Sequence, residues 1–198
     1  IKKYKKIKIY GYDDLDSYTK KKINHYINQN DLKGYGYYCW KPFIIHKFLK
    51  KVPKNSIVQY LDIGFHINPN GIKILEQYID LCKKKNFINF MYKKLKNNSL
   101  KNLKQQLLFE NEYSKRDLWE KLNLTPASDI MKSGQIISGI FFFMNNYKSK
   151  KIIKNWLDLS KNMNLMDDTS SKSKELKSFI EHRHDQSVFS LLCKKFKT

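Results

Sequence analysis

Arginine, glycine, proline and cysteine are all scarce in this chain of 198 residues. Arg116 and Arg183 are the only arginines, so lysine carries almost all of the formal net charge of +21. Proteins that read nucleic acids use arginine for bidentate contacts with phosphates and guanine, so the scarcity of arginine argues against a nucleic acid partner. We interpret the charge as a solvated lysine surface, and the alternative is weak attraction to an anionic membrane face or a nucleotide diphosphate.

Cysteine pairs and long apolar runs are also missing. Cys39, Cys82 and Cys193 are widely spaced, which argues against a disulfide framework and a zinc site and favours a reducing compartment. The longest apolar stretch, residues 136–144, is much shorter than the roughly 20 residues that span a bilayer. We therefore predict a cytoplasmic protein whose contact with a membrane, at its inner face, would be peripheral.

The chain does contain enough apolar sequence for one core. Its hydrophobic fraction of 41% and its many tyrosines and phenylalanines differ from the composition of disordered chains. Residues 1–198 fit a single domain of common size. The first residue is Ile1, and we expect that an N-terminal piece precedes it in the full protein.

Hydrophobic periodicity predicts an alternation of strands and helices. The predicted strands lie at 7–10, 56–62, 87–91 and 135–144. One predicted helix follows Asp16, and the others lie at 42–51, 72–82, 115–122, 149–162 and 185–196. Residues 93–106 could form a helix or a surface excursion. Such an alternation is typical of an α/β fold.

Asp62 closes the best strand pattern and is followed by Gly64. In open α/β sheets, ligands bind beyond the carboxyl ends of the strands. A carboxylate at such a position can hold a divalent cation that grips two phosphates of a nucleotide. The alternative is that Asp62 caps the turn that follows it. His66 is a weaker candidate ligand for the same site.

The segment from Glu181 to Ser187 crowds several reactive side chains before an apolar helix. His182 and His184 could bind a metal ion, Arg183 could contact a diphosphate, and Asp185 could accept a proton. The alternative is that Asp185 caps the helix while the basic residues are solvated.

The segment from Gly34 to Pro42 combines aromatic residues, two glycines and Lys41. Aromatic faces can stack on a sugar or a nucleobase, and Lys41 could reach a phosphate. A packed turn leading into a helix explains the pattern equally well. Farther along, Gly139 interrupts a strand pattern, which often marks the close approach of a ligand or of backbone.

Five segments, taken in order, resemble GT-A glycosyltransferases of the bacterial and viral surface-polysaccharide (capsular) type. They lie at 34–45, 57–64, 113–117, 134–139 and 182–187. The resemblance implies an α/β fold, namely a GT-A, Rossmann-like single domain with a mixed, mostly parallel central sheet flanked by helices. It also implies an enzyme of polysaccharide biosynthesis that moves a sugar from a nucleotide-sugar donor to a hydroxyl of a glycan or lipid-linked acceptor, with Mn²⁺ or Mg²⁺ as cofactor.

The same resemblance implies roles for particular residues. Asp62 would be the surviving acid of a DxD-type motif whose second acid is replaced by Gly64, and His182 and His184 would complete the metal site. Asp185 would be the catalytic base. The other substrate contacts would be Lys41 and Arg183 at the diphosphate, and Tyr37, Trp40, Gln135, Gly139 and Gln186 at the rest of the ligand. The alternative is a non-catalytic carbohydrate- or polyanion-binding domain with a lysine-rich surface.

Overall fold

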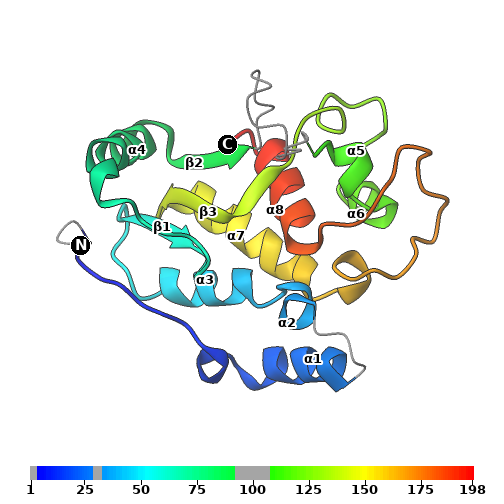
Figure 1. Ribbon diagram of the computed structural model, residues 1–198, viewed down its shortest axis with the longest axis horizontal. Coiled ribbons are helices and arrows are strands. Elements are labelled where there is room, and N and C mark those ends of the chain that lie inside the picture. The colour runs from blue at the N-terminus through cyan, green and yellow to red at the C-terminus, as the bar shows by residue number, and fades with distance from the viewer. Residues whose placement is uncertain (1–3, 29–32, 92–107) are drawn as a thin grey trace.

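The structure of the protein, a computed structural model, describes residues 4–28, 33–91 and 108–198 (Figure 1). The strands are β1 (Ile57–Leu61), β2 (Phe87–Met91) and β3 (Ile136–Met144). The helices are α1 (Ser17–Asn28), α2 (Gly34–Tyr37), α3 (Lys41–Leu49), α4 (Ile72–Lys85), α5 (Glu110–Tyr113), α6 (Arg116–Lys121), α7 (Tyr147–Ser160) and α8 (His184–Lys195). Short 3-10 turns lie at Tyr12–Asp14, Pro69–Gly71 and Met163–Leu165.

The three strands form one sheet in the order β1-β3-β2, and β3 is antiparallel to both of its neighbours. Tyr60 of β1 lies opposite Phe141 of β3, and Phe87 of β2 lies opposite Phe143. The prediction of a Rossmann-like GT-A domain with a mostly parallel central sheet is therefore wrong. Within the described residues the sheet is small and antiparallel.

The alternation of elements misled the prediction because it fixes neither the order nor the direction of the strands. β1 and β2 do run parallel to each other and are joined through α4, as in a βαβ unit. However, β3 lies between them and runs the opposite way. The connection from β2 to β3 covers residues 92–135, which is long enough for β3 to enter the sheet at any position.

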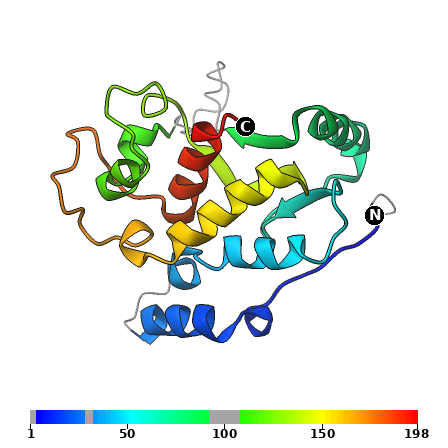
Figure 2. The ribbon, with the colours of Figure 1, turned by 180° about the vertical axis from the view of Figure 1, so that it is seen from behind.

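The sheet separates two hydrophobic clusters because successive side chains of β3 point to opposite faces. Phe141 and Phe143 point into the main core, where Trp156 of α7 and Phe189 of α8 pack against Phe141. Phe142 points to the other face and packs against α4. In Figure 2, which views the molecule from behind, α7 and α8 lie across the sheet. This burial on both faces accounts for the continuous apolar run of β3.

The predictions of individual elements are mostly confirmed. The strands predicted at 56–62, 87–91 and 135–144 and the helices predicted from 42, 72, 115, 149 and 185 are present, with ends shifted by a few residues. The strand predicted at 7–10 is wrong, because these residues have no strand partner, and Ile7 and Ile9 are 62% and 76% exposed. The predicted segment 93–106 lies outside the described residues.

Two predictions from composition can be compared with the structure. Cys39, Cys82 and Cys193 are free and buried. Burial raises the pKa of Cys39 and of Cys193 to about 12, so these two thiols are protonated and unreactive at neutral pH. Among the described helices, none combines the length and the apolar composition needed to cross a membrane.

Candidate functional site

The ammonium group of Lys41 lies between two carboxylates from distant parts of the chain. Its Nζ atom is 2.9 Å from Oδ2 of Asp62 and 3.0 Å from Oδ2 of Asp185. Asp62 directly follows β1, Lys41 is the first residue of α3, and Asp185 lies in the first turn of α8. We call Lys41, Asp62 and Asp185 the Lys41 cluster. The fold thus brings together candidate residues from three separate sequence segments.

The members of the Lys41 cluster differ in their exposure to solvent. The side chains of Lys41 and Asp185 are each 4% exposed, whereas that of Asp62 is 29% exposed. Charges buried to this degree are tolerated only when they are paired, and the cluster provides the pairing. Asp62 is therefore the member that a ligand can touch, and Lys41 and Asp185 lie behind it.

The carboxylates keep Lys41 cationic. Burial alone would lower the pKa of the Lys41 ammonium, but Asp185 and Asp62 together outweigh burial and raise this pKa above its ordinary value. Burial raises the pKa of Asp185, and this effect is opposed by Lys41 and by a 2.8 Å hydrogen bond that the Ser138 hydroxyl donates. A fixed positive charge therefore stands directly behind the exposed carboxylate of Asp62.

Neighbours on β1 and β3 hold Asp62 in place. The Tyr60 hydroxyl donates a 2.6 Å hydrogen bond to Oδ1 of Asp62, and the backbone N–H of Asp62 donates to the carbonyl of Gly139 at 2.8 Å. A Cβ atom on Gly139 would lie 2.9 Å from Oδ2 of Asp62 and 2.8 Å from the Phe65 ring. Glycine is therefore required there by the position of Asp62, and contact between Gly139 and a substrate stays a prediction.

The aromatic segment before Lys41 forms a left-handed turn. The φ angle is positive at every residue from Gly34, at 56°, to Tyr38, at 60°. The backbone N–H groups of Tyr37 and Tyr38 donate to the carbonyls of Lys33 and Gly34 at 2.8 and 3.0 Å. Residues with a Cβ atom lose roughly 1–2 kcal/mol each in this conformation, so the surrounding packing must hold the turn in place.

The turn directs its tyrosines to different places. Tyr37 is 4% exposed and packs on the His184 ring at a centroid distance of 4.7 Å. Tyr38 is 36% exposed, and the Lys41 ammonium lies 4.7 Å from its ring centroid. Trp40 is half-buried and donates its indole N–H to the carbonyl of Gly34. Tyr37 and Trp40 were the predicted aromatic substrate contacts, whereas the exposed ring beside the Lys41 ammonium is that of Tyr38.

His182 is built into the interior through both of its ring nitrogens. Nδ1 accepts a 3.3 Å hydrogen bond from the backbone N–H of Lys115, and Nε2–H donates to the carbonyl of Leu165 at 3.0 Å. These bonds select the neutral form of the ring. Burial, the nearby His184 ring and the Lys115 ammonium lower the pKa of His182 well below its ordinary value. A metal ion would have to displace one of these hydrogen bonds.

His184 likewise uses Nδ1 in a 2.8 Å hydrogen bond to the carbonyl of Met166. In the part of the chain that the structure describes, no three side chains of His, Cys, Asp or Glu are arranged to hold a metal ion. The predicted metal set of Asp62, His182 and His184 is thus not assembled here.

Gln135 and Gln186 belong to a second group of polar side chains, in which Gln135 is buried and Gln186 half-buried. Gln135 is 0% exposed, and its amide donates to the carboxylate of Glu110 and to the Ser187 hydroxyl, each at 3.1 Å. Gln186 donates to Oε1 of Gln135 at 2.9 Å. Glu110 is also 0% exposed and lies 2.6 Å from the ammonium of Lys194. We call Glu110, Gln135 and Lys194 the Glu110 cluster, which joins α5, the residue before β3, and α8 through contacts within the protein.

The described contacts of Arg183 are with residues outside the Lys41 cluster. Its Nη1 atom is 3.4 Å from a carboxylate oxygen of Glu181, and its guanidinium group lies over the Tyr113 ring. Among the described contacts of Arg183, none reaches Asp62 or Asp185. Its predicted contact with a diphosphate stays a prediction.

Sequence analysis missed Tyr38, Tyr60 and Ser138 as parts of the site. A signal for Tyr60 was present, because residues two apart in a strand share one face and Tyr60 precedes Asp62 by two positions. Ser138 stood out only as a small residue beside Gly139. The orientation of Tyr38 depends on the left-handed turn, for which the sequence gives no simple pattern.

No protein-family model, curated protein or solved structure matches the chain. The site must therefore be interpreted from its own chemistry. It consists of a partly exposed carboxylate backed by a buried ammonium group and a second, buried carboxylate. Such an arrangement can accept a hydrogen bond or a proton from a hydroxyl group, and its charges are already fixed in position before a ligand binds.

Proposed function

We propose that this protein transfers a glycosyl group from a nucleotide-sugar donor to a hydroxyl of a glycan or glycolipid acceptor. The Lys41 cluster carries the proposal, because it presents the Asp62 carboxylate to solvent while Lys41 and Asp185 fix that carboxylate from behind. All three residues come from segments that resemble surface-polysaccharide glycosyltransferases. The proposal does not depend on a Rossmann-like sheet, since function follows from the site rather than from the fold.

Asp62 is the residue that we assign to the reacting groups. Its two oxygens accept hydrogen bonds from Tyr60 and Lys41, and each retains a lone pair for a further hydroxyl. In an inverting transfer, Asp62 accepts the proton of the acceptor hydroxyl while that oxygen bonds to the anomeric carbon and the nucleotide diphosphate departs. Asp185, which the sequence favoured as the base, is 4% exposed and is a positioning residue for Lys41.

The residues around Asp62 do not fit a divalent cation. The Lys41 ammonium already fills the space between the two carboxylates, at 2.9 and 3.0 Å from their oxygens. His182 has no ring nitrogen left for a metal. We therefore derive no step through Mn²⁺ or Mg²⁺. In this proposal the Lys41 ammonium holds the base in position, 2.9 Å from Oδ2 of Asp62.

The first experiment tests donor binding. A ligand that binds the folded state raises the melting temperature by mass action, so we would compare UDP, GDP, CMP, dTDP and their common sugar conjugates by thermal shift. We expect one nucleotide family to stabilise the protein and its sugar conjugate to be turned over. Stabilisation by none of them, together with no turnover, would contradict the proposal.

The second experiment tests the role of Asp62. We expect Asp62→Asn to keep nucleotide binding and to lower turnover by about 10² to 10⁴-fold, because the amide cannot accept the proton. The matched control is Asp80→Asn, which makes the same chemical change at an exposed carboxylate paired with Lys83. This control should leave turnover unchanged. Equal turnover by the two variants would remove Asp62 from the reaction.

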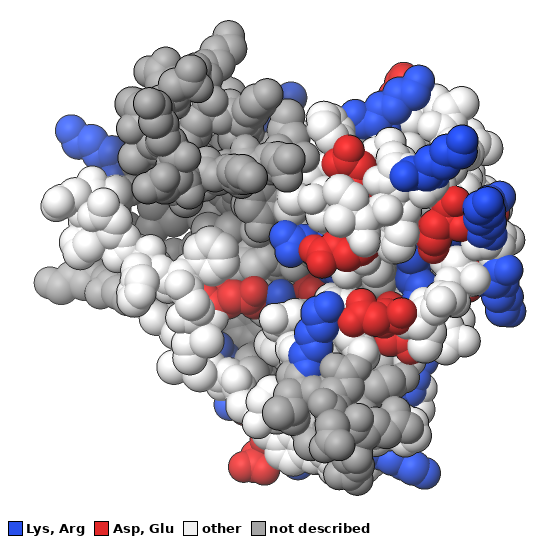
Figure 3. All heavy atoms as spheres, turned by 45° about the vertical axis from the view of Figure 1, so that its right-hand side comes forward, with Lys and Arg blue, Asp and Glu red and all other residues white. Residues whose placement is uncertain are grey.

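A non-catalytic polyanion-binding domain is the alternative, and it is favoured by the net charge of +21. Figure 3 shows acidic side chains interspersed among the basic ones on the face drawn there, rather than one continuous basic surface. A polyanion-binding protein would bind heparin with an affinity that falls steeply as salt rises. Steep salt dependence combined with no response to any nucleotide sugar would favour this alternative.

A further inference from the structure

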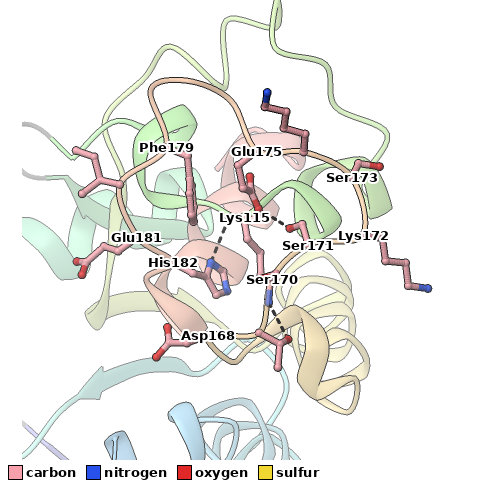
Figure 4. Close-up of a pocket in the computed structure, with 13 residues that line it drawn as sticks. Lys115, Asp168, Ser170, Ser171, Lys172, Ser173, Glu175, Phe179, Glu181 and His182 are labelled. Atoms are coloured by element: carbon pink, nitrogen blue, oxygen red, sulfur yellow. Dashed lines mark hydrogen bonds between the residues drawn. The ribbon is translucent and has the colours of Figure 1, made fainter.

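The segment between α7 and α8 lines a cavity of about 590 Å³ that is partly open to solvent (Figure 4). Its wall consists of residues 168–175 and 179–182 together with Lys115. A volume of this size is typical of pockets that hold small molecules. Lys41, Asp62 and Asp185 do not line it, so this cavity is separate from the Lys41 cluster.

Hydrogen bonds to the first residues of α6 fix the shape of the wall. The Glu175 carboxylate accepts from the backbone N–H of Arg116 at 3.0 Å, and the Ser171 hydroxyl accepts from the N–H of Asp117 at 3.2 Å. In return, the backbone N–H of Lys172 donates to Oδ1 of Asp117 at 3.0 Å. The cavity is therefore formed before a ligand arrives, which lowers the entropic cost of binding.

The charged groups around the cavity are paired within the protein, which favours a neutral ligand. Of the carboxylates in the wall, Asp168 lies 3.1 Å from Lys33 Nζ, Glu175 accepts from the Arg116 N–H, and Glu181 lies 3.4 Å from Arg183 Nη1. Lys115 is 2% exposed, and its ammonium donates to the carbonyl of Asp167 at 3.0 Å, to the carboxylate of Asp167 at 3.3 Å and to Thr169. Lys172 points away from the cavity in Figure 4, and Lys174 is exposed. A phosphate would need cationic contacts inside the cavity, and the buried ammonium there is already committed.

Phe179 gives the cavity an apolar side. Its ring points towards Lys115 and His182 in Figure 4, is half-buried and belongs to neither hydrophobic core cluster. Ser170, which also lines the cavity, is exposed. A cavity with an aromatic ring face and a serine hydroxyl in its wall suits a saccharide, because the C–H face of a sugar packs on an aromatic ring while its hydroxyls form hydrogen bonds.

The start of α8 connects the cavity to the Lys41 cluster. Asp168, which lines the cavity, has its Oδ1 atom 3.8 Å from Nε2 of His184. His184 precedes Asp185 in the chain, and its Nε2 atom is buried without a hydrogen-bond partner among the described residues. A molecule in the cavity would thus lie on the other side of this residue pair from Lys41.

We propose that the cavity binds a neutral saccharide with one sugar face against Phe179. Saccharide binding does not rest on the proposed function, because Phe179 and Asp62 belong to different parts of the molecule and can be altered separately.

The test is saturation-transfer difference NMR with the methyl glycosides of glucose, galactose, mannose, N-acetylglucosamine and fucose. Each would be present at about 10 mM, roughly ten times a Kd of about 1 mM. We expect at least one glycoside to receive saturation from the wild-type protein, and Phe179→Ala to reduce this signal at least about fivefold. The control Tyr147→Ala removes an aromatic side chain that is 81% exposed outside the cavity and should leave the signal unchanged.

Two results would overturn the saccharide site. One is the absence of any signal that depends on Phe179 across the panel, with thermal melts showing that the variant is folded. The other is a stronger Phe179-dependent saturation transfer to UMP than to any glycoside, with inorganic phosphate displacing UMP, which would make the cavity an anion site. Asp62→Asn separates the two proposals, because it should lower turnover by about 10² to 10⁴-fold and keep glycoside binding. Glycoside binding by a wild-type protein that turns over no nucleotide sugar would overturn the transferase function, but not the saccharide site.

Discussion

Lys41 and Lys194 lie beside carboxylates with side chains that are 4% and 11% exposed, but the carboxylates of the two clusters differ in their exposure to solvent. In the Glu110 cluster, Glu110 is 0% exposed and finds all of its partners within the protein. In the Lys41 cluster, Asp62 is 29% exposed and retains hydrogen-bonding capacity for a ligand. Buried charge alone therefore does not indicate function. The informative feature is a charged group that reaches solvent while buried partners hold it.

The ammonium groups of the two clusters respond differently to their surroundings. Burial lowers the pKa of Lys194 despite the opposing effect of Glu110. Burial would also lower the pKa of Lys41, but two carboxylates outweigh it and raise that pKa. The second carboxylate of the Lys41 cluster, Asp185, thus secures the positive charge even when Asp62 interacts with a ligand.

The sharpest test of the comparison makes the same change in each cluster. We expect Glu110→Gln to lower the free energy of unfolding by about 3 kcal/mol, because it leaves the Lys194 ammonium buried without a counter-charge. Asp62→Asn should cost less than about 1 kcal/mol, since Asp62 is partly solvated and Lys41 keeps Asp185. Urea denaturation measures both values. Equal losses of unfolding free energy would mean that the greater exposure of Asp62 does not make its charge less important for stability.

Gly139→Ala would distort the Lys41 cluster and leave the Glu110 cluster in place. The added Cβ atom would lie 2.9 Å from Asp62 Oδ2 and 2.8 Å from the Phe65 ring, and we expect a loss of about 1–3 kcal/mol in stability together with reduced turnover. Gly64→Ala is the matched control, because a Cβ atom there has nothing within 4 Å. Wild-type turnover by Gly139→Ala would show that the position of Asp62 is not critical.

His182 is a third buried polar side chain, and its burial predicts that the stability of the protein depends on pH. Burial lowers its pKa in the folded protein well below 6.5, so the unfolded chain takes up a proton first as the pH falls. Its contribution to stability is therefore complete above about pH 6.5 and declines below it, by up to about 1.4 kcal/mol per pH unit. Thermal unfolding between pH 7 and pH 5 measures this decline. His182→Gln should flatten it, and an unchanged slope in that variant would assign the decline to other groups.

The last prediction is that removal of metal ions has no effect on turnover. If the ammonium of Lys41 takes the place that a divalent cation would fill, EDTA should leave donor turnover unchanged, and added Mn²⁺ should not increase it. The measurement is the initial rate of donor consumption before and after chelation. Activity that disappears with EDTA and returns with Mn²⁺ would show that the cluster rearranges to bind a metal.

Local patterns predicted the elements well because the period of the hydrophobic residues follows from helix and strand geometry. The same patterns could not place β3, since its position between β1 and β2 depends on packing across the whole sheet. For the site, strand ends and crowded polar segments pointed to Asp62, Lys41 and Asp185. They could not distinguish a residue that faces a ligand from one that is buried in the interior, as Gln135 is.

The left-handed turn from Gly34 to Tyr38 has a consequence for the order in which the protein folds. Its three tyrosines adopt a backbone conformation that an isolated chain avoids, so the turn has no intrinsic tendency to form early. It can persist only after α3, α8 and the main core have assembled around it. Amide hydrogen exchange at Tyr37 and Tyr38 should therefore be faster than in α7. The region beside Lys41 would then be the last to take shape during folding and the first to be lost under mild denaturing conditions.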